Sequence, residues 1–300
     1  MILLYIAAAL VFLVFLISIL LCRYCLYGKR QDETEARSWQ EKHYSLEWYD
    51  RSEKEPFIVT SGDGYTLYAE WVRCPGKARG CVILSHGYTD NHLGALKYGE
   101  MYQKLGFDLV VYDLRGHGRN KRTFCTYSIR ESEDLAAVIK QVRKRSKPGL
   151  PVGLHGESLG AATTIACLKT EPDVDFAVAD CAFAEIMPIF KRGMKGMRLP
   201  TFLVYTASLC SKLFYGYAFS KMRPVDALPP GRGLPILFIH GADDDFIPPQ
   251  HSVRMHDAAP GSDLVLIPDA GHASSVFAHP DLYARAVADF LGRHFQAFQN

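Results

Sequence analysis

The hydrophobic and polar positions divide this chain of 300 residues into three parts. Residues 2–22 (ILLYIAAALVFLVFLISILLC) carry no charged side chain. Residues 23–56 hold 7 basic and 8 acidic residues and few aliphatic ones. From residue 57 onward, short apolar runs alternate with stretches in which apolar residues recur at helical spacing. The pattern predicts an apolar helix at 2–22, a charged linker at 23–56 and one folded domain at 57–300. The aromatic residues of the linker suggest that it docks partly on the domain or the membrane interface.

The apolar run at 2–22 has the length of a membrane-spanning helix. Its 21 residues, at a rise of 1.5 Å each, span about 31 Å, close to the roughly 30 Å hydrocarbon core of a bilayer. The alternative is a cleaved signal peptide, which has a basic start, a shorter apolar core and a small-residue cleavage site. Here no Lys or Arg precedes the run, and Ala7 to Ala9 lie near its start. We therefore expect a retained single-pass anchor, with the lipid bilayer as its partner.

Basic residues follow the apolar run before any acidic residue does. Arg23, Lys29 and Arg30 precede Asp32, whereas the other side of the run offers only the α-amino group. The positive-inside rule therefore places the remainder of the chain in the cytoplasm. The eight cysteines are scattered without the spacing of a disulfide framework or a zinc site, which agrees with a reducing compartment.

Short apolar runs in the third part of the chain predict eight strands. The first two flank Ser61-Gly62-Asp63-Gly64, a turn signal that predicts a hairpin. Helical patterns separate most of the later runs, and such alternation is typical of a largely parallel sheet covered on both faces. The fold class predicted is therefore α/β. The expected strands lie at 57–60, 65–72, 81–84, 107–112, 151–154, 176–179, 236–239 and 264–267.

One segment, residues 183–228, breaks this alternation. It carries Pro188, Pro200, several aromatic residues and the apolar stretch FLVYTASLCSKLFY, and it contains no convincing strand. We predict a small helical cap inserted over the end of the sheet. Its apolar side chains could form an acyl pocket or could pack the cap onto the core, and the sequence leaves both open.

Composition excludes several classes of protein. The chain has 34 basic and 32 acidic residues, a formal net charge of +2, and is 48% hydrophobic and 22% charged. These values exclude a disordered chain, a collagen-like repeat and a polytopic membrane protein. The balanced charge provides no broad field for nucleic acid, so we expect no nucleic-acid partner.

The strongest local motif is Gly156-Glu157-Ser158-Leu159-Gly160. It stands between the strand predicted at 151–154 and a helix predicted at 159–169. The two glycines permit a sharp turn that exposes the Ser158 hydroxyl above the sheet, at a helix amino terminus. A strand–turn–helix context is what this motif requires, so Ser158 is the candidate nucleophile.

A serine hydroxyl needs a base to take its proton and a carboxylate to orient that base. His272 follows the last predicted strand and precedes the final helix, at the edge of the sheet where such a base should stand. Three consecutive aspartates, Asp243 to Asp245, follow the strand at 236–239. Asp244 is the predicted acid, with Asp180 as the alternative position. The aspartates lack complementary metal ligands, so we expect neither a metal ion nor a cofactor.

An oxyanion in the transition state requires hydrogen-bond donors. One is the backbone N–H of Leu159, the residue after the nucleophile. The other should come from the loop after an early strand, where the backbone N–H of Tyr88 stands. His86 in the same loop is interpreted as structural, and residues 113–118 (DLRGHG) as a tight turn that forms the floor of the site.

These motifs together resemble the α/β-hydrolase superfamily over about residues 57–295. HGYT, DLRGHG, GESLG, HGADDDFIP and GH occur in the order that the family shows. The resemblance implies the fold, the serine hydrolase class and Asp244 as the acid, and it is nearest to membrane-anchored hydrolases of the serine aminopeptidase-like or monoacylglycerol lipase-like group. Glu157 departs from the histidine, methionine or aspartate of better known lipases, so lipase activity is not implied.

The leading hypothesis is a membrane-anchored serine hydrolase that cleaves small-molecule carboxylic esters through an acyl-Ser158 intermediate. A second hypothesis keeps the same triad but cleaves amides, as an aminopeptidase-like enzyme in which Glu157 holds the substrate amine. Thioesterase action on acyl-proteins is a third. A non-catalytic binding protein on a hydrolase fold is a remote alternative, because no member of the triad is missing.

Overall fold

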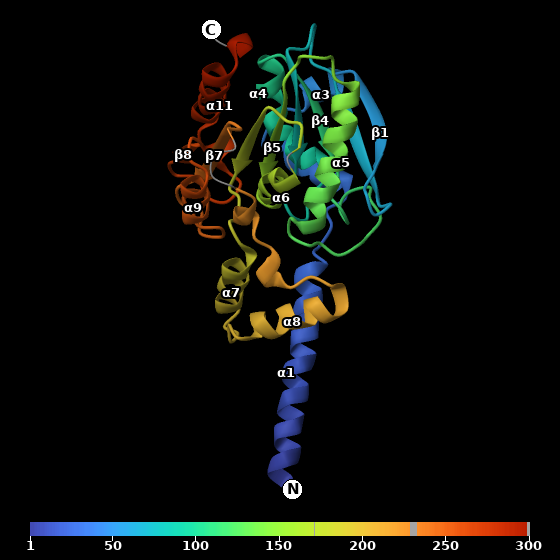
Figure 1. Ribbon diagram of the computed structural model, residues 1–300, viewed down its shortest axis with the longest axis vertical. Helices are drawn as coiled ribbons and strands as arrows, with labels where there is room; N and C mark the ends of the chain where they lie inside the picture. The colour runs from blue at the N-terminus through green and yellow to red at the C-terminus, as the bar shows by residue number, and fades with distance from the viewer. Residues whose placement is uncertain (171, 229–232, 299–300) are drawn as a thin grey trace.

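The computed structural model describes residues 1–170, 172–228 and 233–298, and it is built around one eight-stranded sheet (Figure 1). The order of strands is β1-β2-β4-β3-β5-β6-β7-β8. Strand β2 runs antiparallel to both of its neighbours, and the other pairs are parallel. The strands are β1 (Lys54–Thr60), β2 (Thr66–Val72), β3 (Gly80–Ser85), β4 (Phe107–Tyr112), β5 (Val152–Glu157), β6 (Phe176–Asp180), β7 (Ile236–Gly241) and β8 (Asp263–Ile267).

Helices connect the strands and cover the sheet (Figure 1). The α-helices are α1 (Ile2–Leu26), α2 (Glu33–Glu41), α3 (Glu47–Arg51), α4 (Gly99–Lys104), α5 (Ile129–Arg145), α6 (Leu159–Cys167), α7 (Ile186–Gly196), α8 (Leu203–Tyr215), α9 (Gln250–Ala258), α10 (Ser275–Ala278) and α11 (Pro280–His294). Short 3₁₀ helices are η1 (His92–Tyr98), η2 (Leu168–Thr170), η3 (Phe219–Lys221), η4 (Pro224–Ala227) and η5 (Gln296–Phe298).

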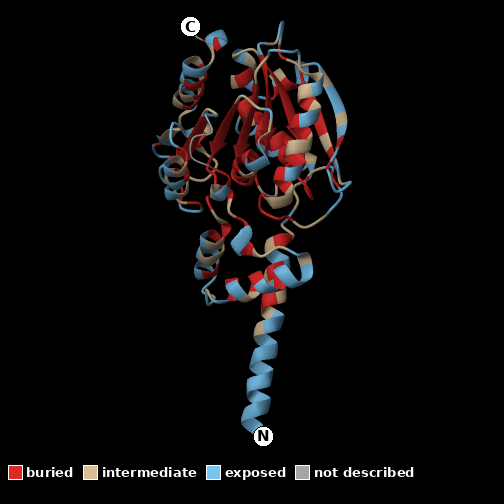
Figure 2. Cartoon of the chain, in the orientation of Figure 1, coloured by how far each residue is buried: buried red, intermediate tan, exposed pale blue. Residues whose placement is uncertain are grey.

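Both faces of the sheet are buried, as Figure 2 shows. Successive residues of a strand point to opposite faces, so β4 sends Val110 to one core and Val111 to the other. The first core is completed by α5, α6 and the cap, and the second by η1, α4 and α11. The predicted α/β class, with a mostly parallel sheet between layers of helices and an apolar helix before it, is confirmed.

Helix α1 is 25 residues long and apolar enough to cross a membrane, by length and composition. Most of it projects from the rest of the molecule and is exposed (Figure 2). Only Ser18, Cys22 and Leu26 are buried in it, all near its carboxyl end. The helix therefore continues four residues beyond the apolar run at 2–22 and ends inside the folded part of the protein.

The segment expected as a charged linker, residues 23–56, is folded against the domain. It contains α2, α3 and the start of β1, which begins three residues before the expected boundary at 57. Ala36, Leu46 and Tyr49 from this segment are buried in the second core. The sequence predicted a charged linker that docks partly on the domain or the membrane interface, and in the structure the segment packs on the domain through α2 and α3.

The cap predicted at 183–228 consists of α7, α8, η3 and η4, and none of its residues forms a strand. It lies between the sheet and the projecting part of α1, and α8 crosses α1 there (Figure 1). The hydrolase domain was predicted to extend to residue 300. Residues 299 and 300 lie outside the described residues, as do 171 and 229–232.

Candidate active site

Ser158 occupies a sharp turn between β5 and α6. Its backbone has φ 51° and ψ −111°, a conformation that an L-residue adopts only under constraint. The constraint comes from two close backbone approaches. A Cβ at Gly156 would lie 2.2 Å from the carbonyl oxygen of Gly160, and a Cβ at Gly160 would lie 2.1 Å from that of Ser85. Both positions therefore require glycine, and the turn holds the Ser158 hydroxyl at the carboxyl edge of the sheet.

The structure brings Ser158, His272 and Asp244 together. His272 Nε2 lies 3.0 Å from Ser158 Oγ, and His272 Nδ1 lies 2.7 Å from Asp244 Oδ2. The three residues follow β5, β8 and β7, so parallel strands deliver all of them to one edge of the sheet. With Nδ1–H donating to the carboxylate, Nε2 is free to accept the serine proton, which is the arrangement that nucleophilic catalysis requires.

Asp244 is fixed and kept ionised by its neighbours. Its Oδ1 accepts hydrogen bonds from the N–H groups of Phe246 at 3.0 Å and Ile247 at 2.8 Å. Burial acts to raise the pKa of Asp244, but hydrogen bonds from His240 and His272 outweigh it and hold that pKa well below its ordinary value. The carboxylate is therefore available as a permanent partner for the imidazole.

His240 is a residue of this site to which the sequence pattern assigns no role. Its Nε2 lies 3.2 Å from Asp244 Oδ2 and 2.8 Å from the carbonyl oxygen of Ile247, while its Nδ1 lies 2.7 Å from Ser252 Oγ. Its place four residues before Asp244, in the HGADDDFIP motif, is the only signal that could have found it. His240 therefore contacts the same carboxylate oxygen as His272, Oδ2, and helps to hold Asp244 in place.

The two residues predicted to supply oxyanion donors stand at the start of α6 and in the loop after β3. Leu159 is the first residue of α6, where backbone N–H groups have no partner within the helix. The loop that carries Tyr88 approaches so closely that a Cβ at Gly87 would lie 3.9 Å from Ser158 Cβ. Gly87, the residue before Tyr88, therefore lies close to Ser158.

His86 ties this loop to the turn at 113–118. Its Nε2 accepts the N–H of Leu114 at 2.9 Å, and its Nδ1 lies 2.7 Å from the carbonyl oxygen of Gly87. Burial lowers the pKa of His86 to about 3, so the ring stays neutral and can accept. A structural role for His86 fits these contacts.

The end of α1 contacts the same loop. The carbonyl oxygen of Cys25 accepts hydrogen bonds from Tyr88 Oη at 2.8 Å and Tyr127 Oη at 2.5 Å. The N–H of Gln31 donates to the carbonyl oxygen of Thr89 at 2.9 Å. At Gly28 a Cβ would lie 2.4 Å from Tyr88 Oη, so the chain leaving α1 fits closely around this side chain. The loop proposed to supply an oxyanion donor is thus braced by the helix that precedes the domain.

A buried polar network lies beneath the nucleophile. Lys97 forms an ion pair with Glu157, and Tyr98 Oη donates to Glu157 at 2.7 Å and lies 2.9 Å from Asp180 Oδ2. Tyr283 Oη also lies 3.1 Å from Asp180 Oδ2. Asp180 therefore contacts tyrosines rather than His272, and Asp244 occupies the position of the acid. Glu157 is therefore paired with Lys97, a residue to which the sequence pattern assigns no role.

Asp180 makes the stability of the fold depend on pH. Burial, together with the charge of Glu157, raises the pKa of Asp180 to about 6. The folded chain therefore binds this proton more tightly than the unfolded chain, and ionisation lowers stability as pH rises from 4 to 7. Relative to the parent, Asp180→Asn is expected to gain free energy of unfolding over that range, by up to about 3 kcal/mol. Denaturant titrations at four pH values would measure the gain, and Asp289→Asn, at an exposed position, should show none.

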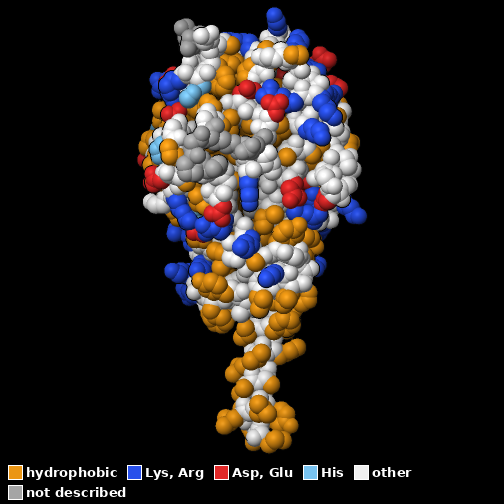
Figure 3. Space-filling model, viewed as in Figure 1, with side chains coloured by type: hydrophobic (Ala, Val, Ile, Leu, Met, Phe, Trp, Pro, Cys, Tyr) orange, Lys and Arg blue, Asp and Glu red, His pale blue; other side chains and the backbone are white. Residues whose placement is uncertain are grey.

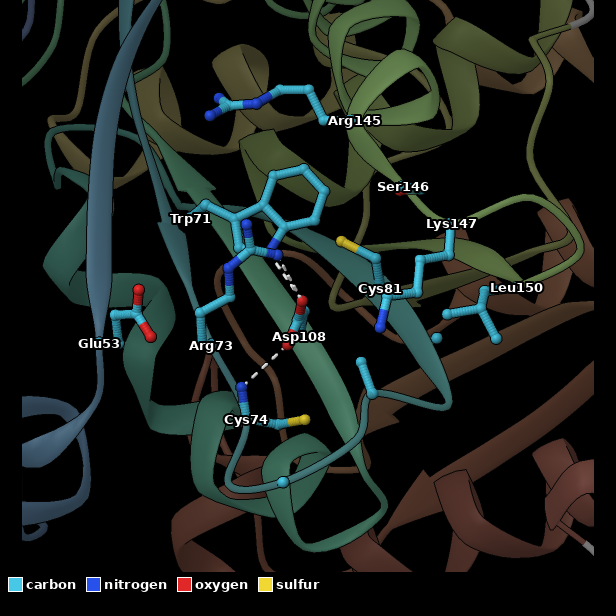
Figure 4. Close-up of a pocket in the computed structure, with 13 residues that line it drawn as sticks. Glu53, Trp71, Arg73, Cys74, Cys81, Asp108, Arg145, Ser146, Lys147 and Leu150 are labelled. Carbon is cyan, nitrogen blue, oxygen red and sulfur yellow. Dashed lines mark hydrogen bonds and ion pairs between the residues drawn. The ribbon is translucent and has the colours of Figure 1, made fainter.

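A cavity of about 480 Å³ opens at the opposite edge of the sheet (Figure 4). Its lining includes Gly80 and Cys81 at the start of β3, whereas Ser158 follows the carboxyl end of β5. Asp108 on its wall accepts hydrogen bonds from Trp71, Arg73 and the N–H of Cys74, each at 2.9 Å. The Asp108 carboxylate therefore already accepts three hydrogen bonds from the protein. The cavity that it lines is separate from the triad.

Comparison with known proteins adds independent information. Residues 82–286 match the alpha/beta hydrolase family. The chain is 30% identical to the Bacillus subtilis protein YqkD over 290 residues, which cover 94% of each chain. It is 29% identical to human monoglyceride lipase over 126 residues, 39% of each chain. Among solved structures it resembles the Pyrococcus furiosus esterase Pf2001, with a TM-score of 0.68 and 22% identity over 84% of this chain and 94% of that one.

Proposed function

Because the chain belongs to the alpha/beta hydrolase family, we propose that it is a serine hydrolase that cleaves carboxylic esters through an acyl intermediate on Ser158. The observation that carries this proposal is the continuous hydrogen-bonded chain from Ser158 through His272 to Asp244, at 3.0 Å and 2.7 Å. These three residues were predicted from the sequence alone, and each of them follows a different strand of the sheet.

The geometry supports a two-step reaction. His272 Nε2 takes the proton of Ser158 as Oγ attacks the ester carbon, and the carbonyl oxygen becomes an oxyanion that faces the N–H groups of Leu159 and Tyr88. His272 then gives the proton to the departing alkoxide, which leaves as the alcohol. Water, deprotonated by His272, attacks the acyl-Ser158 ester and releases the carboxylic acid. Asp244 remains ionised throughout and stabilises the imidazolium.

Ester cleavage is favoured over aminopeptidase-like cleavage of amides. The amide hypothesis requires a carboxylate to hold the substrate amine, and Glu157 was the candidate. In the structure this carboxylate pairs with Lys97 and accepts a hydrogen bond from Tyr98, all buried. The charge of Glu157 is therefore already paired within the protein, and the buried carboxylate is not available to bind a cationic substrate. Thioester cleavage uses the same groups and is not distinguished by any contact.

We further propose that α1 anchors the enzyme in a bilayer as a single-pass helix. Its length and composition suit a span, and most of its apolar side chains have no protein partner (Figure 2). Arg23, Lys29 and Arg30 follow the apolar run, so the catalytic domain would face the cytoplasm. The protein would then consist of three parts: the anchor at 2–22, the docked segment at 23–56 and the hydrolase domain at 57–300, which includes the cap at 183–228.

Covalent labelling tests the assignment of the nucleophile. A fluorophosphonate probe is expected to label the parent protein at a single site and to leave Ser158→Ala unlabelled, because only an activated serine displaces the fluoride. Ser220→Ala, at an exposed serine of the cap, is the matched control and should label normally. Full labelling of the Ser158→Ala protein would overturn the proposal.

A further inference from the structure

We propose that the cap is a second membrane contact: α8 lies in the interfacial region of an anionic bilayer, beside the point at which α1 enters it. This inference rests on the proposed span of α1. It adds an interaction surface of defined chemistry, a phospholipid bilayer with anionic headgroups, and it assigns a role to the exposed apolar side chains of the cap.

The first argument concerns where α8 crosses α1 (Figure 1). Ser18 Oγ donates to Thr206 Oγ1 at 2.6 Å, and Ser18 is fully buried in this contact. The part of α1 beyond the contact, residues 2–17, spans about 24 Å at 1.5 Å per residue. A hydrocarbon core of about 30 Å is longer than that. If α1 spans the core, the boundary of the membrane must therefore reach the level of α8.

The second argument is an apolar stripe along α8. Phe202, Tyr205, Leu209 and Leu213 recur at helical spacing, and each is more than half exposed. The opposite face of the helix, with Val204, Ala207 and Cys210, is buried in the first core, to which the end of α1 also contributes. A contiguous apolar surface of this kind marks an interaction site. Figure 3 shows hydrophobic side chains gathered on the cap where α1 leaves it.

The third argument is charge. Between Ile186 and Met222 the cap has six basic residues and no acidic one, although the whole chain has a net charge of only +2. All but one of the six are exposed, and none forms an ion pair with any part of the chain that the structure describes. Basic side chains around an apolar stripe are typical of a helix that lies on an anionic membrane surface. The six are Lys191, Arg192, Lys195, Arg198, Lys212 and Lys221.

Tryptophan quenching by brominated lipids tests this position in the full-length chain. Three single variants report on the cap (Leu213→Trp), the anchor (Leu13→Trp) and an exposed strand position away from both (Ile58→Trp). The three native tryptophans are common to all of them. Each protein is reconstituted in vesicles of phosphatidylcholine alone or with phosphatidylglycerol, with bromines placed near the headgroup or deep in the acyl chain.

The expected result separates the three positions. Leu13→Trp should be quenched by deep bromines in both lipid mixtures, and Ile58→Trp by neither set. Leu213→Trp should be quenched most by shallow bromines, and more strongly when phosphatidylglycerol is present. If Leu13→Trp is quenched but Leu213→Trp matches Ile58→Trp, the docking of the cap is overturned while the span stands. Absence of quenching at Leu13→Trp would overturn the span itself, and the geometry proposed for α8 with it.

Charge reversal tests the preference for anionic lipid. In the Leu213→Trp background, combined replacement of Arg192, Lys195 and Arg198 by Glu should remove the increase in quenching that phosphatidylglycerol produces. The same charge change at Lys77, Lys140 and Lys144, in the β2–β3 loop and on α5, is the matched control and should leave the increase intact. Circular dichroism would verify that both triple variants fold. An undiminished increase in the cap variant would overturn the electrostatic part of the proposal.

A second copy of the chain is the competing occupant of the stripe. In that case the tryptophan at position 213 would be shielded both from lipid bromines and from aqueous iodide, and cross-linking would trap a dimer. That combination would also overturn docking on the bilayer.

Discussion

Replacing His272 with alanine is expected to lower kcat for ester hydrolysis by on the order of 10⁴- to 10⁶-fold, with little change in KM. His272 is the only base within hydrogen-bonding distance of Ser158 Oγ in the described part of the chain. Without it the hydroxyl stays protonated and the leaving alkoxide has no acid. Substrate binding does not use the imidazole, so the loss falls on the chemical step.

Non-additivity provides the sharper test. If Ser158 and His272 act as one unit, the double variant Ser158→Ala/His272→Ala should be scarcely slower than either single variant. His251→Ala, at a histidine that contacts the backbone of Ala184 outside the triad, is the control and should retain most of kcat. Losses that multiply in the double variant would mean that the two residues act independently, which contradicts the triad.

Gly160→Ala is expected to lower the free energy of unfolding by about 3 kcal/mol or more and to abolish activity. A methyl group at this position would lie 2.1 Å from the carbonyl oxygen of Ser85 and 2.6 Å from that of His86. Both contacts are with backbone atoms, which cannot relieve the clash by a change of rotamer as a side chain can. Relief requires α6 to move away from β3, and that movement displaces Ser158 from His272. Denaturant unfolding and ester hydrolysis measured on the same preparation would check both effects.

Gly193→Ala is the matched control for this substitution. Gly193 lies inside α7, and a Cβ there would meet no atom within 4 Å. Alanine has the higher helix propensity, so this variant should be as stable as the parent or more stable, by about 0.5–1 kcal/mol. Similar losses in the two variants would show that the close approach at Gly160 is not what makes glycine necessary.

The sequence predicts those features that arise from local pattern. Alternation of apolar runs and helical spacing predicted all eight strands. The signal is clearest in β3, β4 and β7, which are buried along their whole length and are therefore largely apolar. The start of α5 also rests on a local contact, since the N–H of Ser128 donates to Glu131, three residues later, at 3.0 Å. The candidate site followed from motifs at strand ends, since parallel strands bring their carboxyl ends to one edge.

Features that depend on distant partners were not predicted. Lys97 and Glu157 stand sixty residues apart in the sequence, and nothing local indicates that the two side chains form a buried ion pair. The segment at 23–56 was expected to be a charged linker that docks partly on the domain or the membrane interface, and the helices α2 and α3 within it were not predicted. Its structure comes from a few apolar side chains such as Tyr49, whose hydroxyl donates to buried Glu70 at 2.5 Å. Tertiary contacts of this kind produce no periodic pattern in the amino-acid sequence.

The bracing of the Tyr88 loop by the end of α1 bears on which part of this protein can be moved or produced alone. Cys25 lies in the last turn of α1, and its carbonyl oxygen is the acceptor for two tyrosines of the domain. The unit that could be fused to another anchor therefore begins inside α1, before Cys25, rather than at residue 57. A fragment that begins at residue 57 would lose this acceptor, the close fit of Gly28 around Tyr88 and the hydrogen bond from Gln31 to Thr89. In such a fragment the loop that carries Tyr88 would lose its contacts with α1 and change conformation, even if the triad stayed in place.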